Sequence, residues 1–197
     1  MISVIIPYIE DRGYLTECVN SIENQTFRDF EIIHAKGNNS LGKNVNNGVK
    51  KAKGEFIKVV AEDDKLTPNA LKDLSEGISN YDWVVGSAVN FINEDDYPFS
   101  KFLAVKTDIQ LMLERNQIHG GTPLYRKDLW GRFQGWDEKL TTGEEYDWHL
   151  KLLKNETNLA YIKDVVCWYR LWNGSKSGNG QSKERDIIIN QIKARYK

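Results

Sequence analysis

The sequence predicts a single α/β domain in which a mainly parallel sheet is flanked by helices. Two observations carry this prediction: short, β-branched apolar segments alternate with amphipathic segments through the first half of the chain, and 197 residues suit one domain. Parallel strands joined by right-handed crossovers place their strand-to-helix turns at one edge of the sheet. Ligands bind at that edge in open α/β sheets, so we expect a site there.

Strands and helices should alternate through the first half. The opening segment 2–7 is apolar and closes with proline, which is typical of a strand buried on both faces. Thr67 and Pro68 favour a helix start, with a hydroxyl cap and proline in the first turn. The expected strands are 2–7, 30–35, 56–61 and 83–89, and the expected helices are 15–22, 41–52 and 67–78.

The second half is less regular. Glycine and asparagine mark 174–180 as a flexible loop, and a last helix carries Ile188 and Ile192. We place the end of the domain at residue 170, with 171–197 as a flexible loop plus a C-terminal helix. The other expected elements are helices at 108–115 and 142–154, strands at 122–125 and 165–171, and loops at 94–98 and 131–140.

Composition and charge exclude several classes of protein. The net charge is −1, so the chain cannot hold nucleic acid by its overall electrostatic field. Cys18 and Cys167 have no metal-ligand spacing and suit a reduced compartment. The N-terminus lacks a basic leader, and no apolar run approaches the ~20 residues of a membrane span. We therefore expect a cytoplasmic protein.

Three consecutive carboxylates, Glu62, Asp63 and Asp64, follow the third expected strand. Mutual repulsion and partial desolvation disfavour charging all three. A divalent cation would relieve that cost, and hard oxygen ligands suit Mg²⁺ or Mn²⁺. Such an ion can bridge the diphosphate of an activated sugar nucleotide and stabilise the charge on the departing group. The alternative is that Asp63 or Asp64 only caps a turn before the next helix.

A series of motifs resembles glycosyltransferase family 2, whose members are inverting enzymes. No single motif is specific, but together they cover residues 2–75 with few gaps and continue to about residue 154. The matching segments are Ser3–Pro7 (SVIIP), Gln25–Phe27 (QTF), Glu31–Ile33 (EII), Asn44 with Asn47-Gly48, Ala52–Ile57 (AKGEFI), Leu66, Pro68, Ala70 and Leu71 after Asp64, Gly120–Thr122, Tyr125-Arg126, Gly135–Glu138 (GWDE) and Gly143–Trp148.

The resemblance implies a GT-A (Rossmann-like) fold and the transfer, with inversion, of a sugar from a nucleoside-diphosphate sugar to an acceptor hydroxyl with Mn²⁺ or Mg²⁺. Residues 1–91 would form the nucleotide-sugar-binding half and 92–170 the acceptor half. Asp63 is implied as the preferred metal ligand, with Glu62 at the ribose or metal and Asp64 in support. The donor-binding residues are expected to be Pro7, Tyr8, Glu10, Lys36, Asn44, Asn47, Glu62, Asp63 and Arg170, although Tyr8 could instead serve loop packing.

The chain departs from the family pattern in its first half at two places. Lys36 and Gly37 stand where members usually carry an Asp pair that helps to hold the base. Lys36 either approaches a phosphate or base edge or is simply solvated. Ala61 stands where the commonest acidic motif begins with Asp, and Glu62 is the residue that could take over that role.

A third departure follows the last expected strand, where family members often place a His or Arg that binds metal or phosphate. The segment here has no His, so Arg170 or Lys176 is the candidate for stabilising the diphosphate. The loop 174–180 either closes over the donor as a lid or is an exposed linker.

A second acidic segment begins the expected helix 142–154. Inverting transfer needs a base that takes the proton from the acceptor hydroxyl, and the resemblance aligns Glu145 with the usual Asp base. Glu144 is the reserve base, and Asp147 would orient or contact the acceptor. The alternative is a capping box, in which Thr142 and Glu145 satisfy the helix N-terminus.

The expected partners are a nucleoside-diphosphate sugar and a glycan, lipid-linked or other hydroxyl acceptor, with no nucleic acid. From Arg170 onward the chain contains seven Lys or Arg residues and only two acidic ones. This excess of positive charge favours either a peripheral contact with the inner face of a membrane or a solvated helix face. The oligomeric state is left open. Two rival functions remain: a non-catalytic nucleotide-sugar-binding relative, and a nucleotidyltransferase, which would favour a Gly-rich basic loop after the first strand.

Overall fold

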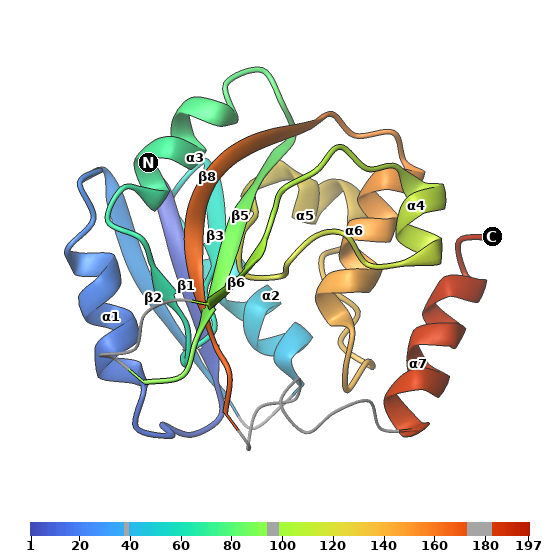
Figure 1. Cartoon of the computed structure of the whole chain (residues 1–197), viewed down its shortest axis with the longest axis horizontal. Helices are drawn as coiled ribbons and strands as arrows, with labels where there is room; N and C mark the ends of the chain where they lie inside the picture. The colour runs from blue at the N-terminus through green and yellow to red at the C-terminus, as the bar shows by residue number, and fades with distance from the viewer. Residues whose placement is uncertain (38–39, 94–98, 173–182) are drawn as a thin grey trace.

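The computed structural model describes residues 1–37, 40–93, 99–172 and 183–197. The expected loops at 94–98 and 174–180, including Lys176 and the suggested lid, lie outside these ranges. In the described part of the chain, eight strands form one sheet, and helices cover both of its faces (Figure 1). The chain is therefore the single α/β domain that the sequence predicts.

The structure contains the longer strands and helices that the sequence predicts, together with several short ones. The strands are β1 (Ile2–Tyr8), β2 (Phe30–Lys36), β3 (Phe56–Val59), β4 (Lys65–Leu66), β5 (Trp83–Phe91), β6 (Phe99–Phe102), β7 (Leu124–Arg126) and β8 (Leu159–Arg170). The helices are α1 (Leu15–Glu23), α2 (Leu41–Lys51), α3 (Ala70–Gly77), α4 (Ile109–Glu114), α5 (Asp128–Phe133), α6 (Glu144–Lys154) and α7 (Lys183–Ala194).

The sheet is mixed, with the order β2-β1-β3-β7-β5-β8-β4 and with β6 paired to β5. Its longest pairings, β1 with β2 and β5 with β8, are parallel, as is β1 with β3. The short strands β4, β6 and β7 run antiparallel to their neighbours. Because β1 and β3 are parallel neighbours, their carboxyl ends lie side by side, where the acidic segment begins.

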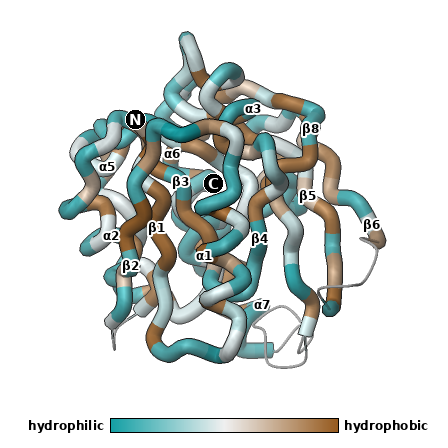
Figure 2. Tube along the Cα trace, turned by 90° about the vertical axis from the view of Figure 1, so that its left-hand side faces the viewer, coloured by the Kyte–Doolittle hydropathy of each residue, from teal (hydrophilic) through white to brown (hydrophobic). Residues whose placement is uncertain are grey.

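Each face of the sheet has its own core. Val4 and Ile6 of β1 pack toward α1 and α3, whereas Ile5 packs toward α2 and the helices of the second half. Successive side chains of a strand point to opposite faces, which explains why β1 is apolar at almost every position. Figure 2 shows this hydrophobic character along β1 and β5, with hydrophilic residues gathered in the connecting loops.

Two local expectations are wrong. The Thr67 hydroxyl does not cap a helix but donates to the Val165 carbonyl oxygen (2.6 Å), and α3 begins three residues later. The reason is that Lys65 and Leu66 pair with β8, which draws this segment into the sheet. The expected loop 131–140 begins inside α5, which sequence periodicity did not indicate.

In the described ranges, no helix is long and apolar enough to cross a membrane.

Candidate active site

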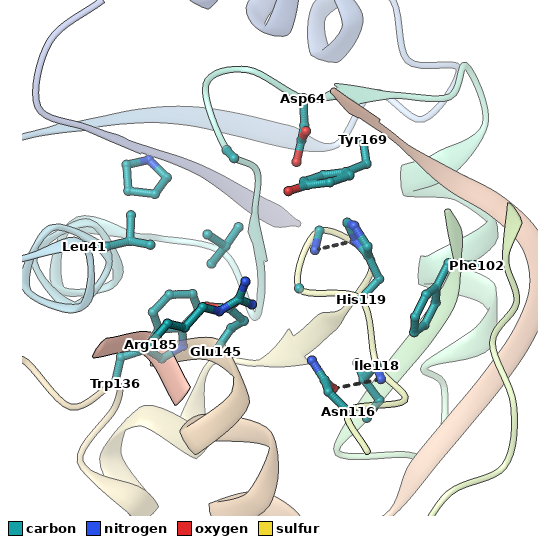
Figure 3. Close-up of a pocket in the computed structure, with 15 residues that line it drawn as sticks. Leu41, Asp64, Phe102, Asn116, Ile118, His119, Trp136, Glu145, Tyr169 and Arg185 are labelled. Carbon is teal, nitrogen blue, oxygen red and sulfur yellow. Dashed lines mark hydrogen bonds between the residues drawn. The ribbon is translucent and has the colours of Figure 1, made fainter. Parts of the chain in front are cut away.

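Two adjoining cavities lie at the carboxyl ends of β1 and β3. The first, of about 470 Å³, is lined by Tyr8, Glu62 and Asp63 among others, and we name it the Asp63 cavity. The second, of about 280 Å³, is lined by Asp64, His119 and Glu145 among others, and we name it the Glu145 cavity (Figure 3). The residues that line both are Pro7, Leu41, Ala61 and Tyr169.

The carboxylates of the acidic segment face different surroundings. Glu62 is buried, with Oε1 3.6 Å from Arg12 Nε, and burial raises its pKa to about 7. Asp63 is half-buried in the Asp63 cavity and accepts a hydrogen bond from Trp172 Nε1 (2.8 Å). Asp64 lines the other cavity and accepts one from the Arg170 backbone N–H (3.0 Å); burial raises its pKa well above the usual range.

The three carboxylates therefore do not form the joint ligand set that the sequence suggested. Within the ranges that the structure describes, no group of three or more His, Cys, Asp or Glu residues is placed to hold a metal ion. Asp64 lines the Glu145 cavity instead of the Asp63 cavity, and the Arg170 backbone N–H donates to its Oδ1. Mg²⁺ and Mn²⁺ at phosphate sites need only one or two carboxylates, since the substrate and water supply the other ligands. Asp63, with Glu62 beside it in the same cavity, fits that simpler arrangement.

Glu145 extends into the cavity instead of capping its helix. The N-cap residue of α6 is Gly143, with φ of +75°, so the box expected from Thr142 does not form. The Glu145 side chain lies against Gly120, where an added β-carbon would be 2.8 Å from Glu145 Cγ. Glycine is needed there because any side chain would displace the carboxylate.

The other two acids of α6 separate from Glu145. Glu144 is buried and lines the Asp63 cavity. Asp147 lies outside both cavities and accepts hydrogen bonds from Arg195 Nη1 (3.1 Å) and the Tyr196 hydroxyl (3.0 Å). Its contacts are those of a residue that anchors the C-terminal segment, so we do not place Asp147 at the acceptor.

Of the expected donor-binding residues, some line the Asp63 cavity and others lie outside both cavities. Pro7, Tyr8 and Asn44 line the Asp63 cavity, and Asn44 Nδ2 donates to the Tyr8 carbonyl oxygen (3.3 Å). Glu10 and Lys36 are exposed and Asn47 is half-buried, and these three side chains line neither cavity.

Arg170 is also absent from the cavity walls. It is buried, and its guanidinium donates to the carbonyl oxygens of Asp63 and Ile92 (3.0 Å each) and to Glu17 Oε2 (2.5 Å). These contacts engage all three guanidinium nitrogens, so Arg170 supports the acidic segment from outside the two cavities.

Several residues outside the expected site set complete the Glu145 cavity, and for two of them, His119 beside Gly120-Gly121 and Trp136, the sequence carried a signal. His119 lines it, and burial lowers the His119 pKa to about 4, so the ring is neutral. Tyr169 stacks edge-on against His119, with ring centroids 4.6 Å apart. Trp136 stands in the GWDE motif, which was a signal for it, whereas Arg185 comes from α7 and carries no motif.

Comparison with known proteins identifies the family of this chain. A family model described as glycosyl transferase family 2 matches residues 28–141, and the chain belongs to that family. An uncharacterized glycosyltransferase of Rickettsia typhi is 26% identical over 78% of this chain and 59% of its own length. One of Methanocaldococcus jannaschii is 24% identical over 100% of this chain and 80% of its own length. The chain spans 59% of the Rickettsia prowazekii relative and 37% of that from Rickettsia conorii.

The fold is also found among solved structures. The crystal structure of residues 1–349 of Staphylococcus aureus TarS, in complex with UDP-GlcNAc, aligns with a TM-score of 0.77 at 20% identity, over 99% of this chain and 66% of that one. This likeness shows the fold, which is GT-A.

Proposed function

We propose that the chain transfers a sugar, with inversion, from a nucleoside-diphosphate sugar to an acceptor hydroxyl. One observation carries the proposal: Asp63 and Glu145 line two cavities that share four wall residues. A donor diphosphate at Asp63 would thus place its sugar toward a carboxylate on the neighbouring side. Donor binding and proton abstraction require that arrangement.

The donor belongs in the Asp63 cavity. Asp63, assisted by Glu62, is the residue that would hold Mn²⁺ or Mg²⁺, and the ion supplies positive charge against the departing diphosphate. Tyr8 and Asn44 border the same cavity and suit the nucleoside. A UDP-sugar is the first donor to test, because the structurally similar TarS binds UDP-GlcNAc in its crystal structure.

In the reaction, the Glu145 carboxylate takes the proton of the acceptor hydroxyl. The hydroxyl oxygen then forms a bond with the anomeric carbon on the face opposite the diphosphate, and the bond from that carbon to the diphosphate oxygen breaks, which inverts the configuration. Glu144 lines the donor side and remains the reserve base. The neutral His119 beside the acceptor adds no charge that would compete for the proton.

The acceptor enters the Glu145 cavity. Its walls include Phe102, Trp136 and Tyr169, and aromatic side chains offer apolar surface with polar edges, which suits a glycan. A lipid-linked or other hydroxyl acceptor fits the same chemistry. TarS is named a poly(ribitol-phosphate) beta-N-acetylglucosaminyltransferase, so an acceptor with phosphate groups is a specific candidate.

A membrane contact at the cytoplasmic face is the remaining part of the proposal. It would use the basic residues of 183–197. Arg195 is engaged by Asp137 and Asp147, and Lys193 donates to the Glu114 carbonyl oxygen (3.2 Å). The exposed Lys183 and Lys197 are the groups for such a contact.

A second candidate is a nucleotide-sugar-binding relative without turnover, and the scattered carboxylates of the acidic segment favour it. The test is to add Mn²⁺ and UDP-, GDP- and dTDP-sugars, and to measure binding by calorimetry and donor hydrolysis by chromatography. We expect Glu145→Gln to lower hydrolysis by about 10²- to 10⁴-fold with unchanged donor binding. Asp63→Asn should weaken Mn²⁺-dependent binding.

Glu10→Gln is the matched control, because Glu10 is an exposed acid outside both cavities. It should leave both measurements unchanged. Donor binding without hydrolysis, indifferent to Glu145→Gln, would establish the second candidate instead.

A further inference from the structure

Lys58 is a lysine in the core of the sheet. It lies in β3 among apolar residues, and its side chain is 0% exposed. Its ammonium donates to two backbone carbonyl oxygens, those of Gly121 (2.5 Å) and Pro123 (3.2 Å). Burying an ammonium is costly, and here burial lowers its pKa to about 8. The two hydrogen bonds of the ammonium offset part of this cost.

The two carbonyl groups belong to a tight turn at 119–122 and the residue that follows it. The Thr122 N–H donates to the His119 carbonyl oxygen (3.1 Å), which closes the turn. Inside it, the Gly121 N–H donates to His119 Nδ1 (3.1 Å). The ammonium of Lys58 thus holds this turn against the central sheet, just before β7 pairs with β3.

The turn is packed between two acids of the candidate site. On one side, a β-carbon on Gly120 would lie 2.8 Å from Glu145 Cγ. On the other, a β-carbon on Gly121 would lie 3.4 Å from Asp64 Oδ2 and 2.8 Å from Cys167 Sγ. Since neither glycine has space beside it, a movement of the turn would move Glu145 as well. Figure 3 shows His119 of this turn and Glu145 in the wall of the same cavity.

We propose that Lys58 is a positioning residue, which fixes the 119–122 turn and thereby holds Glu145 at its working distance from the donor. This inference rests on the proposed function. Lys58 touches no substrate, and it acts through the backbone of the turn. A merely structural role, such as holding β3 against the segment that precedes β7, would affect stability without separating turnover from binding.

The test compares Lys58→Met, which keeps the length of the side chain but removes its charge and donors, with Lys127→Met. Lys127 is the matched control, because its ammonium also donates to a backbone carbonyl oxygen, that of Ala52, away from both cavities. Donor hydrolysis and calorimetric binding of UDP with Mn²⁺ are measured for both.

We expect Lys58→Met to lower the kcat of hydrolysis by about 10- to 100-fold, because a displacement of about 1 Å at the reacting groups costs up to that factor. UDP binding should stay within twofold, and Lys127→Met should change neither quantity. In the Glu145→Gln background, Lys58→Met should have little further effect, since both changes act on one group. An unchanged kcat, or a loss of UDP binding equal to the loss of kcat, would overturn the inference.

If Lys58→Met does not fold, Lys58→Gln, which keeps a donor for one carbonyl, should show the same split between turnover and binding. A folded Lys58→Gln with normal kcat would overturn the inference, and so would failure of both variants to fold. The proposed function fails separately, when the wild-type protein hydrolyses no donor or when Glu145→Gln has no effect.

Discussion

Asn46 of α2 shows how a single side chain can hold the wall of the site. Its Oδ1 accepts from Trp130 Nε1 (3.2 Å) and the Trp136 backbone N–H (3.0 Å). Its Nδ2 donates to the Trp136 carbonyl oxygen (2.9 Å) and to Glu138 Oε1 (3.1 Å). Asn46 thus fixes the loop that brings Trp136 to the Glu145 cavity.

We expect Asn46→Ala to lower the free energy of unfolding by about 2–4 kcal/mol, because a buried polar group left without its partner costs about 1–3 kcal/mol and several are left here. Urea unfolding followed by tryptophan fluorescence measures the change. Donor hydrolysis should fall too, since Trp136 loses its support.

Asn47→Ala is the control, because Asn47 is half-buried on the same helix and lines neither cavity. It should shift the unfolding free energy by less than about 0.5 kcal/mol. Equal effects of the two substitutions would mean that the hydrogen bonds of Asn46 contribute nothing specific.

At the scale of elements, α7 depends on Asp147 for its place. Arg195 and Tyr196, directly after the helix, both bond to Asp147. Ile192 packs where a β-carbon on Gly143 would lie 3.1 Å away. Through these contacts α7 is docked on α6, and its first turn brings Arg185 to the Glu145 cavity.

Asp147→Asn and Arg195→Met should therefore have similar effects. Asp147→Asn removes the charge that Arg195 and Tyr196 bond to, and Arg195→Met removes the donor to both Asp147 and Asp137. We expect each to lower the free energy of unfolding by about 1–3 kcal/mol. Donor hydrolysis should fall by a similar factor in both. If Asp147→Asn alone lost hydrolysis while Arg195→Met kept the wild-type rate, Asp147 would instead act at the acceptor, as expected from the sequence.

For the molecule as a whole, the sequence predicted those elements that have a local pattern of apolar residues. The long strands and the helices α1, α2 and α6 have clear apolar patterns. Asp63 and Glu145, which line the two cavities, lie in motifs at the ends of elements, and their roles stay predictions. The short strands β4 and β6 carry too few residues for a periodicity, so tertiary pairing decides them. Lys58 and Asn46 act on partners 63 and 90 positions away, and a single sequence does not show such contacts.

The global stability should also respond to pH through the buried His149 and the half-buried His119. His149 stacks on Trp83, and its Nε2 lies 2.7 Å from the Tyr125 hydroxyl oxygen. Burial lowers the pKa of His149 to about 3 and that of His119 to about 4, from an ordinary value of 6.5. Both rings are neutral in the folded protein at any pH above these values.

Because these pKa values are depressed, the unfolded chain binds protons below pH 6.5 that the folded chain does not bind. The contribution of the two rings to stability is therefore complete above pH 6.5. It is lost as the pH falls toward 4 for His119 and toward 3 for His149. The raised pKa of Glu62 acts in the opposite sense, so the informative quantity is a difference between variants. Between pH 6 and 4, the free energy of unfolding of His149→Gln should fall less steeply than that of wild type, by about 1.4 kcal/mol per pH unit. Urea titrations at several pH values measure this slope.

His34→Gln is the control, because His34 is an exposed histidine, and it should keep the wild-type slope. A wild-type slope in His149→Gln would show that the buried ring does not control acid stability.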